Sequence, residues 1–117
     1  MLILIGADGN NLESAVAKRF GHAEYLILFD TGTNKYEAFE NNNEGHNHEN
    51  LQEFLDKGVE VFIVGNIGPH AFDILKSVKS KIYLARKMKV SEAIDLFSQN
   101  RLTELFEPTA KKSIGHS

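Results

Sequence analysis

The chain contains no cysteine among its 117 residues, and only two prolines. Without thiols it forms no disulfide, binds no metal through thiolate sulfur and has no catalytic cysteine. Any metal that it binds must therefore be held by histidine, carboxylate, methionine sulfur or backbone oxygen. This absence leaves the histidines as the first candidates for metal ligands.

The sequence also lacks long apolar runs and a strong charge of either sign. The apolar run at residues 2–5 is far shorter than a membrane span, has no basic leader, and is interrupted by Gly6 and Asp8. A formal net charge of −3 gives no electrostatic basis for binding nucleic acid. We therefore expect a cytoplasmic protein that binds neither nucleic acid nor membrane and exists as a monomer or weak dimer.

The length and the hydrophobic content of 42% predict one domain with a real core. Apolar periodicity continues as far as Phe106, and residues 107–117 show none. We therefore predict a domain over residues 1–106, followed by a flexible C-terminal tail over residues 107–117.

Four segments have the patterns of β-strands. Residues 1–7 and 59–64 are short, nearly continuous apolar runs, which predict central parallel strands covered on both faces. Residues 25–29 are similarly apolar. Residues 35–40 alternate charged with apolar side chains, as an edge strand does, and the turn signal at residues 31–34 joins these last two strands in a hairpin.

Three segments after the hairpin show the helical spacing of apolar residues. The first is predicted to begin at Asn50 and to end at Lys57 and Gly58, and the other two cover residues 72–78 and 90–97. A strand at residues 81–85 separates the last two helices. This order of elements predicts an α/β fold with a five-stranded mixed sheet flanked by helices.

The predicted topology brings most of the loops to one edge of the sheet. If the strands at residues 1–7, 59–64 and 81–85 are parallel and joined by right-handed crossovers, their carboxyl ends meet at that edge, where open α/β sheets bind ligands. The loops expected there are residues 8–10, 19–23, 41–50, 65–68 and 86–89. This edge is therefore the predicted ligand site.

One of these loops has the composition of an anion-binding turn. Residues 64–70 read Val-Gly-Asn-Ile-Gly-Pro-His and lie directly between a predicted strand and a predicted helix. Gly65 and Gly68 allow backbone geometries closed to other residues, and Pro69 suits the first helical position. The start of the helix presents N–H groups and the positive end of its dipole to an anion. A plain turn without a ligand is the alternative, and the heptapeptide alone does not decide between them.

Three motifs occur in order along the chain. They are Asp8-Gly9-Asn10 with Leu12, Ser14 and Val16; Arg19-Phe20-Gly21-His22-Ala23 with Tyr25; and Gly65-Asn66-Ile67-Gly68-Pro69 with Ala71 and Phe72. Together they resemble the dinitrogenase iron-molybdenum cofactor-binding family, which includes NifX, NafY and the C-terminal domain of NifB. The resemblance covers residues 1–106 with matching spacing, and several motifs in order are more specific than any one of them.

The resemblance implies a ribonuclease H-like mixed sheet of strand order 3-2-1-4-5. It also implies a non-catalytic role, in which the protein binds, stores or delivers an iron-sulfur or iron-molybdenum cluster or its precursor, with cofactor-assembly proteins as partners. Many members occur outside nitrogen fixation, so nitrogenase itself is not implied. The predicted cofactor-binding residues are Asp8, Asn10, Arg19, Phe20, Gly21, His22, Gly65, Asn66, Gly68, Pro69, Arg86 and Lys87.

Two positions near the predicted site depart from the family pattern. His22 stands where the family commonly has arginine, which replaces a permanent cation with a group that can also ligate metal. Residues 85–89 replace a glycine-containing loop that usually ends in a threonine cap, so we expect a weaker helix cap and a concentration of positive charge. Arg86 and Lys87 then either favour an anionic cluster or are simply solvated.

A third departure is the loop at residues 44–49, which is often glycine-rich in this family. It contains His46 and His48, and imidazole suits borderline transition metals. We predict His46, His48 and His22 as metal ligands, the first two pointing the same way from an extended segment if the helix begins only near Asn50. A hydrated loop without a ligand is the alternative.

A metal-dependent hydrolase is the alternative from a different class, because a ribonuclease H-like sheet can hold two divalent metals between carboxylates. Asp8 and Asp30 are the available acids. The predicted topology places them at opposite edges of the sheet, and Ser14 has no obvious base partner. The remaining alternative is a module that binds a small anion or a partner protein through the same edge.

Overall fold

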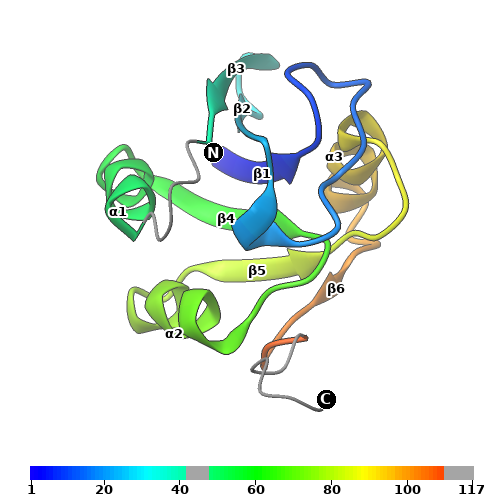
Figure 1. The fold of residues 1–117 in the computed structure, drawn as a ribbon. Helices are drawn as coiled ribbons and strands as arrows, with labels where there is room; N and C mark the ends of the chain where they lie inside the picture. Colours follow the sequence, from blue (N-terminus) through cyan, green and yellow to red (C-terminus); the bar gives the residue numbers. More distant parts are fainter. Residues whose placement is uncertain (42–47, 110–117) are drawn as a thin grey trace.

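The chain begins with a strand and a hairpin, after which helices and strands alternate (Figure 1). The computed structural model describes residues 1–41 and 48–109. In chain order the elements are β1 (Leu2–Ala7), the short 3-10 helix η1 (Phe20–His22), β2 (Tyr25–Asp30), β3 (Lys35–Glu40), α1 (His48–Asp56), β4 (Val59–Val64), α2 (Pro69–Ser77), β5 (Lys81–Leu84), α3 (Val90–Ser98) and β6 (Thr103–Glu104).

All of these strands form one mixed sheet in the order β3-β2-β1-β4-β5-β6. Strands β1, β4 and β5 are parallel, β2 is antiparallel to both of its neighbours, and β6 is antiparallel to β5. The predicted order 3-2-1-4-5 is therefore confirmed as part of a larger sheet. The ribonuclease H-like assignment of this sheet stays a prediction.

The predicted count of five strands is wrong, because the sheet has six. The sixth strand, β6, pairs with Tyr83 and Leu84 of β5. Leu105, which follows it, is buried and donates its N–H to the carbonyl oxygen of Ile82 at 2.7 Å. A strand of two residues is too short to show an alternating pattern, so the sequence does not reveal it.

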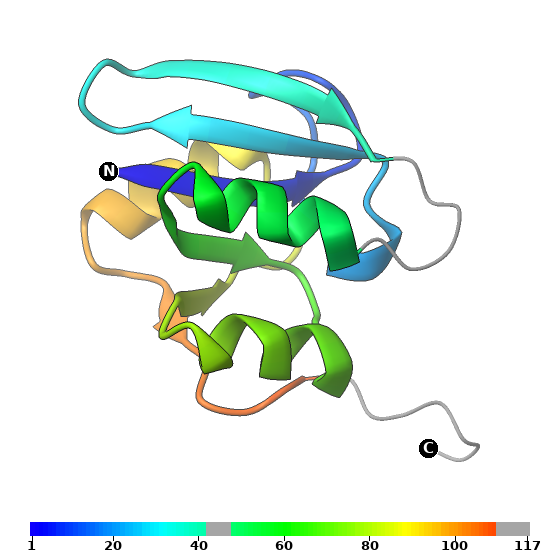
Figure 2. The same ribbon diagram turned by 90° about the vertical axis from the view of Figure 1, so that its left-hand side faces the viewer.

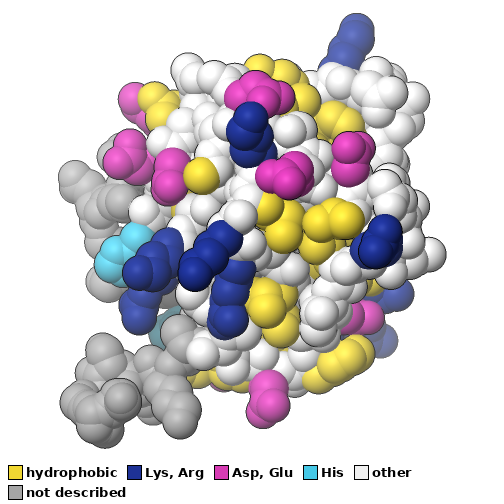
Figure 3. Space-filling view, turned by 90° about the vertical axis from the view of Figure 1, so that its right-hand side faces the viewer, with side chains coloured by type: hydrophobic (Ala, Val, Ile, Leu, Met, Phe, Trp, Pro, Cys, Tyr) yellow, Lys and Arg dark blue, Asp and Glu magenta, His cyan; other side chains and the backbone are white. Residues whose placement is uncertain are grey.

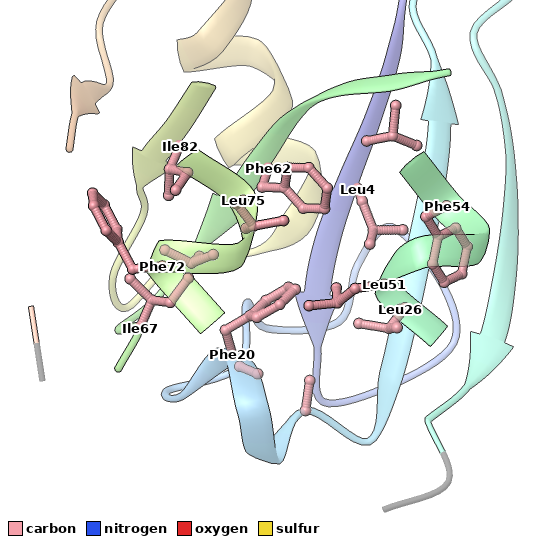
Figure 4. Packing of buried hydrophobic residues seen from close by; sticks show 14 of the residues in the cluster. Leu4, Phe20, Leu26, Leu51, Phe54, Phe62, Ile67, Phe72, Leu75 and Ile82 are labelled. Carbon is pink, nitrogen blue, oxygen red and sulfur yellow. The ribbon is translucent and has the colours of Figure 1, made fainter. Parts of the chain in front are cut away.

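Helices α1 and α2 cover one face of the sheet, and α3 covers the other (Figure 2). The apolar cluster beneath α1 and α2 (Figure 4) includes Leu4, Phe20, Leu26, Leu51, Phe54, Phe62, Ile67, Phe72, Leu75 and Ile82. A second cluster beneath α3 includes Ile3, Ile5, Ile27, Ile63 and Val90. Because alternate residues of a strand point to opposite faces, β1 and β4 contribute to both clusters and are apolar almost throughout, as predicted for central strands.

Helix α1 begins at His48 rather than at the predicted Asn50. Neither glycine nor proline stands between Gly45 and His48 in the sequence to delay the start of the helix. His48 is therefore part of a helix and not of the extended segment predicted to carry it together with His46. His46 lies outside the described residues. Helices α1, α2 and α3 have nine residues each, and no helix in the described chain is long and apolar enough to cross a membrane.

The chain remains attached to the domain beyond Phe106, where the predicted tail begins. Thr109 forms two hydrogen bonds with Ile67, at 3.1 Å and 2.9 Å. The attachment therefore reaches at least to Thr109, and residues 110–117 lie outside the described part of the chain.

Candidate functional site

The loops at the carboxyl ends of the parallel strands meet, as the topology predicts. Phe20 donates its N–H to the carbonyl oxygen of Asn66 at 2.8 Å, which joins η1 to the turn between β4 and α2. The guanidinium of Arg86 donates to Oδ1 of Asn66 at 2.6 Å, which joins that turn to the one between β5 and α3. We call residues 65–68 the β4–α2 turn and residues 85–89 the β5–α3 turn.

The chain itself fills the space beside the end of β1. Ala7 pairs with Tyr25 of β2 on one side and with Val16 on the other, which is the side of β4. Val16 in turn donates its N–H to the carbonyl oxygen of Met88 at 2.9 Å. Residues 14–18, here called the crossing segment, therefore occupy the crevice in which open α/β sheets usually bind ligands. A ligand at this edge must lie outside the crossing segment, against the surrounding loops.

Asp8 and Asn10 belong to the turn that leads into the crossing segment. Asp8 donates its N–H to the carbonyl oxygen of Ala15 at 2.9 Å. No hydrogen bond in the described chain joins the side chain of Asp8 or Asn10 to Asn66 or Arg86. The structure thus brings the second and third sequence motifs together through direct contacts, whereas Asp8 and Asn10 of the first motif are linked to them through the crossing segment.

Asn66 is the central connection of the site. Its Nδ2 donates to the carbonyl oxygen of Lys18 at 3.0 Å, and its Oδ1 accepts from Nη2 of Arg86 at 2.6 Å. Its backbone carbonyl accepts the N–H of Phe20. Both polar ends of the side chain are therefore engaged within the protein, so Asn66 positions three loops. Direct contact with a ligand was the predicted role, and the geometry favours a supporting one.

Arg86 also has a structural task that the sequence did not indicate. Besides its bond to Asn66, its Nε donates to the carbonyl oxygen of Gly65 at 3.3 Å. The residue is nevertheless exposed, and a guanidinium carries five N–H donors, so donors remain available on its outer side. Arg86 therefore both locks the β4–α2 turn and adds positive charge beside it.

Four cationic residues surround these contacts, and we call them the cationic rim: Lys18, Arg19, Arg86 and Lys87. All four are exposed, and none forms an ion pair with any described residue. In contrast, Lys89 pairs with Glu13 at 3.1 Å. Figure 3 shows lysine and arginine side chains gathered beside a histidine on this part of the surface. Of the three positive charges in residues 85–89, Arg86 and Lys87 therefore belong to the rim, where Lys18 and Arg19 join them, whereas Lys89 is neutralised by Glu13.

Phe20 is not available to a ligand, although it was predicted to bind one. Its side chain is 4% exposed and its ring meets the ring of Phe62 edge-on, with centroids 6.3 Å apart. Gly6 makes room for it, because a Cβ on Gly6 would come within 3.2 Å of the Phe20 ring. Phe20 therefore anchors η1 in the core.

The glycines of the site fall into two kinds. A Cβ on Gly65 would overlap the carbonyl oxygen of Ala17, so the crossing segment requires glycine there. A Cβ on Gly21 or on Gly68 would meet no atom within 4 Å, and neither residue has a positive φ. The fold therefore does not explain Gly21 and Gly68, which leave their backbone open to an approaching ligand.

The predicted histidines take different positions. His22 is exposed at the end of η1, where its backbone N–H donates to the carbonyl oxygen of Arg19 at 3.1 Å. His48 is the first residue of α1. No group of three or more His, Asp or Glu side chains suited to a metal ion occurs in residues 1–41 and 48–109. His46 lies outside those residues.

Helix α2 begins with the glycine and proline that the sequence places at its start. Gly68 is the N-cap residue, with φ −80° and ψ 168°, and has no side chain of its own to cap the helix. Pro69 occupies the first helical position. Thr109 contacts the same turn, because its Oγ1 accepts the N–H of Ile67 at 2.9 Å. Sequence reasoning missed Thr109, since a single threonine in a segment without periodicity carries no signal of a contact with a distant turn.

Comparison with known proteins gives this geometry a family context. Residues 1–100 match the family described as dinitrogenase iron-molybdenum cofactor. A Thermotoga protein assigned as NifB is 38% identical over 97% of this chain and 98% of its own, with a TM-score of 0.81. The apo form of the orange protein from Desulfovibrio gigas shares the fold at 23% identity, with coverage of 93% and 96% and a TM-score of 0.84. A Methanocaldococcus jannaschii protein assigned as a dinitrogenase shares it at 21% identity, with coverage of 92% and 97% and a TM-score of 0.69. No curated protein matches the chain.

Proposed function

We propose that the edge of the sheet at which β1, β4 and β5 end binds and delivers an anionic metal-sulfur cluster or a precursor of one. The premise is that this chain belongs to the dinitrogenase iron-molybdenum cofactor family. The observation that carries the proposal is the cationic rim. Four like charges gathered at the meeting point of three loops repel one another, and a bound anion relieves that repulsion. The rim is therefore arranged for an anionic cargo.

The chemistry of the available donors supports a cluster that brings its own sulfide. Because the chain has no cysteine, the protein supplies no thiolate to the cargo. It supplies instead positive charge from the rim, N–H donors from Arg86 and the open backbone at Gly21 and Gly68. His22, exposed at the end of η1, is the proposed protein ligand to metal, together with His46 and with His48, the first residue of α1.

We propose a carrier role rather than catalysis. The acids that a two-metal hydrolase would need do not meet: Asp30, at the end of β2, pairs with Leu2 at the start of β1, whereas Asp8 follows the end of β1. Asn66 and Phe20 act as supports, and the groups that face outward are cations. A site built in this way binds and releases an anion without transforming it.

The test uses tetrathiomolybdate as the probe, under anaerobic conditions, with molybdate as an oxygen analogue of equal charge. The triple variant Lys18→Gln, Arg19→Gln, Lys87→Gln removes rim charge and leaves Arg86 and its contacts in place. The matched control is Lys35→Gln, Lys79→Gln, Lys81→Gln, which removes the same charge from exposed lysines at or near the starts of β3 and β5, the opposite edge of the sheet. Retained molybdenum and sulfide are measured after gel filtration, and affinity is measured by titration.

We expect the wild type and the control triple to retain molybdenum and sulfide together, and the rim triple to bind at least about tenfold more weakly. Equal loss in both triples would mean that net charge alone drives binding. Equal affinity for molybdate and thiomolybdate would instead support the small-anion module. Retention of neither probe by the wild type would overturn the cargo proposal.

A further inference from the structure

Thr109 contacts the middle of the β4–α2 turn through both its backbone and its side chain. Its N–H donates to the carbonyl oxygen of Ile67 at 3.1 Å, and its Oγ1 accepts the N–H of Ile67 at 2.9 Å. We call this pair of bonds the Thr109 clasp. It fixes both polar backbone groups of one residue from a segment 42 positions away in the sequence.

The clasp acts on the residue of the turn that follows Asn66. Asn66 ties the turn to η1 and Arg86, while Ile67, the next residue, places its side chain in the core with 1% exposure. Gly68 follows and contributes no side chain. The path of the backbone from Asn66 to the start of α2 is therefore set on one side by Asn66 and on the other by Thr109.

The hydroxyl of Thr109 is the group that satisfies the N–H of Ile67 within the described chain. Removing that oxygen leaves a partly buried donor without its partner, which favours a shifted turn. The segment that carries Thr109 has a separate anchor, because Leu105 is buried and bonded to Ile82. Loss of the hydroxyl should therefore loosen the turn without detaching the segment or opening the core.

We infer that Thr109 is a positioning residue for cargo binding. Through Ile67 it holds Asn66 where Asn66 can bond to both Lys18 and Arg86, and so it sets the geometry of the cationic rim from the far side of the turn. This inference rests on the proposed function, because it concerns the same site. It assigns a role to a residue that lies beyond the end of the sequence motifs.

The test compares Thr109→Val, which removes the hydroxyl at nearly constant shape, with Thr109→Ser, which keeps it. Thr103→Val is the matched control, because Thr103 lies in the same C-terminal segment, is exposed and makes no side-chain hydrogen bond in the described chain. Three quantities are measured on each protein: amide exchange of Ile67 without a ligand, the urea midpoint of unfolding, and the affinity for tetrathiomolybdate.

In Thr109→Val we expect exchange at Ile67 to accelerate and the affinity to fall, each by about fivefold, the factor expected for one hydrogen bond. The urea midpoint should stay close to that of Thr103→Val. Thr109→Ser should restore exchange and affinity together. That rescue separates positioning from a general loss of stability.

Each other outcome has a distinct meaning. Unchanged exchange at Ile67 in Thr109→Val would overturn the clasp. Faster exchange with wild-type affinity would show that the clasp holds the chain without affecting the cargo, which overturns the inference and leaves the cargo proposal intact. A wild-type protein that binds no thiomolybdate would overturn the cargo proposal and, with it, the role assigned to Thr109.

Discussion

The β4–α2 and β5–α3 turns lie side by side at the site, and the helices that follow them are capped in different ways. At the β5–α3 turn, Val90 donates its N–H to the carbonyl oxygen of Ser14 at 2.8 Å, and Ser91 donates to Leu12 at 2.9 Å. The crossing segment and the residues just before it thus close the start of α3 with backbone carbonyls.

Glu92 completes this closed start, because its Oε1 accepts the N–H of Lys89 at 3.1 Å. The weak cap expected for a lysine at this position is therefore compensated by groups from elsewhere in the chain. At the β4–α2 turn the N-cap residue is Gly68, which has no side chain to cap the helix, and Pro69 has no N–H to satisfy. The difference teaches that the molecule closes the start of α3 with groups from distant parts of the chain, whereas the start of α2 depends on its own glycine and proline.

Gly65→Ala should lower the stability of the protein more than any other substitution considered for the two turns. A methyl group at this position overlaps the carbonyl oxygen of Ala17 and lies against that of Lys18, so the crossing segment and the β4–α2 turn cannot keep their present contact. We expect a loss of about 3 kcal/mol in the free energy of unfolding, measured by urea titration.

Gly68→Ala is the matched control for this change, because it adds the same methyl group three positions later in the same turn. Its Cβ meets no atom within 4 Å, and its φ of −80° is allowed for alanine. We expect its free energy of unfolding to stay within about 0.5 kcal/mol of the wild type. Similar losses in both variants would show that glycine at Gly65 is not specifically required by the crossing segment.

Glu92→Ala tests whether the closed turn serves stability alone. The substitution removes the acceptor of the Lys89 N–H at the start of α3 and should cost about 1 kcal/mol in the free energy of unfolding. The affinity for tetrathiomolybdate should change less than twofold, because Glu92 makes no hydrogen bond or ion pair with the β4–α2 turn in the described chain. A large loss of affinity would mean that the two turns are coupled more tightly than their hydrogen bonds indicate.

Lys87→Gly should change stability little and in the favourable direction. Lys87 has a left-handed backbone with φ +56°, as does Lys79 after α2 with φ +63°. Glycine relieves that strain but raises the entropy of the unfolded chain, so unfolding should become at most about 1 kcal/mol less favourable in either variant.

Binding of tetrathiomolybdate then distinguishes these two lysines. Lys79→Gly removes the same charge and the same strain from a position outside the rim, and it should bind like the wild type. Lys87→Gly should bind several-fold more weakly, because a rim charge is lost. Equal affinities, measured by titration at one salt concentration, would remove Lys87 from the rim.

The sequence predicts the central part of this fold well because each prediction depends on a local pattern. The apolar runs of β1 and β4 require burial on both faces, and together with the crossover rule they determine where the strand ends meet. The β4–α2 turn is predictable for the same reason, since the backbone preferences of glycine and proline mark the start of a helix within a few residues. The convergence of the second and third motifs follows from these local features.

The missed features all depend on contacts between distant parts of the backbone. The crossing segment is held by N–H and carbonyl groups, which every residue possesses, so no side chain marks it. Asn66 looks like a ligand residue until its partners Lys18 and Arg86 are known. Phe20 could serve a site or a core, and only the space beside Gly6 decides for the core.

The crossing segment has a further consequence for the rate at which cargo moves between proteins. Because residues 14–18 fill the crevice beside β1, a cluster bound at the rim would rest against the surrounding loops and not between the strand ends. If cargo is held in this way, an acceptor protein can approach it from the solvent side of the rim, whose four cations are exposed. The speed of transfer should then depend on the encounter between the two surfaces.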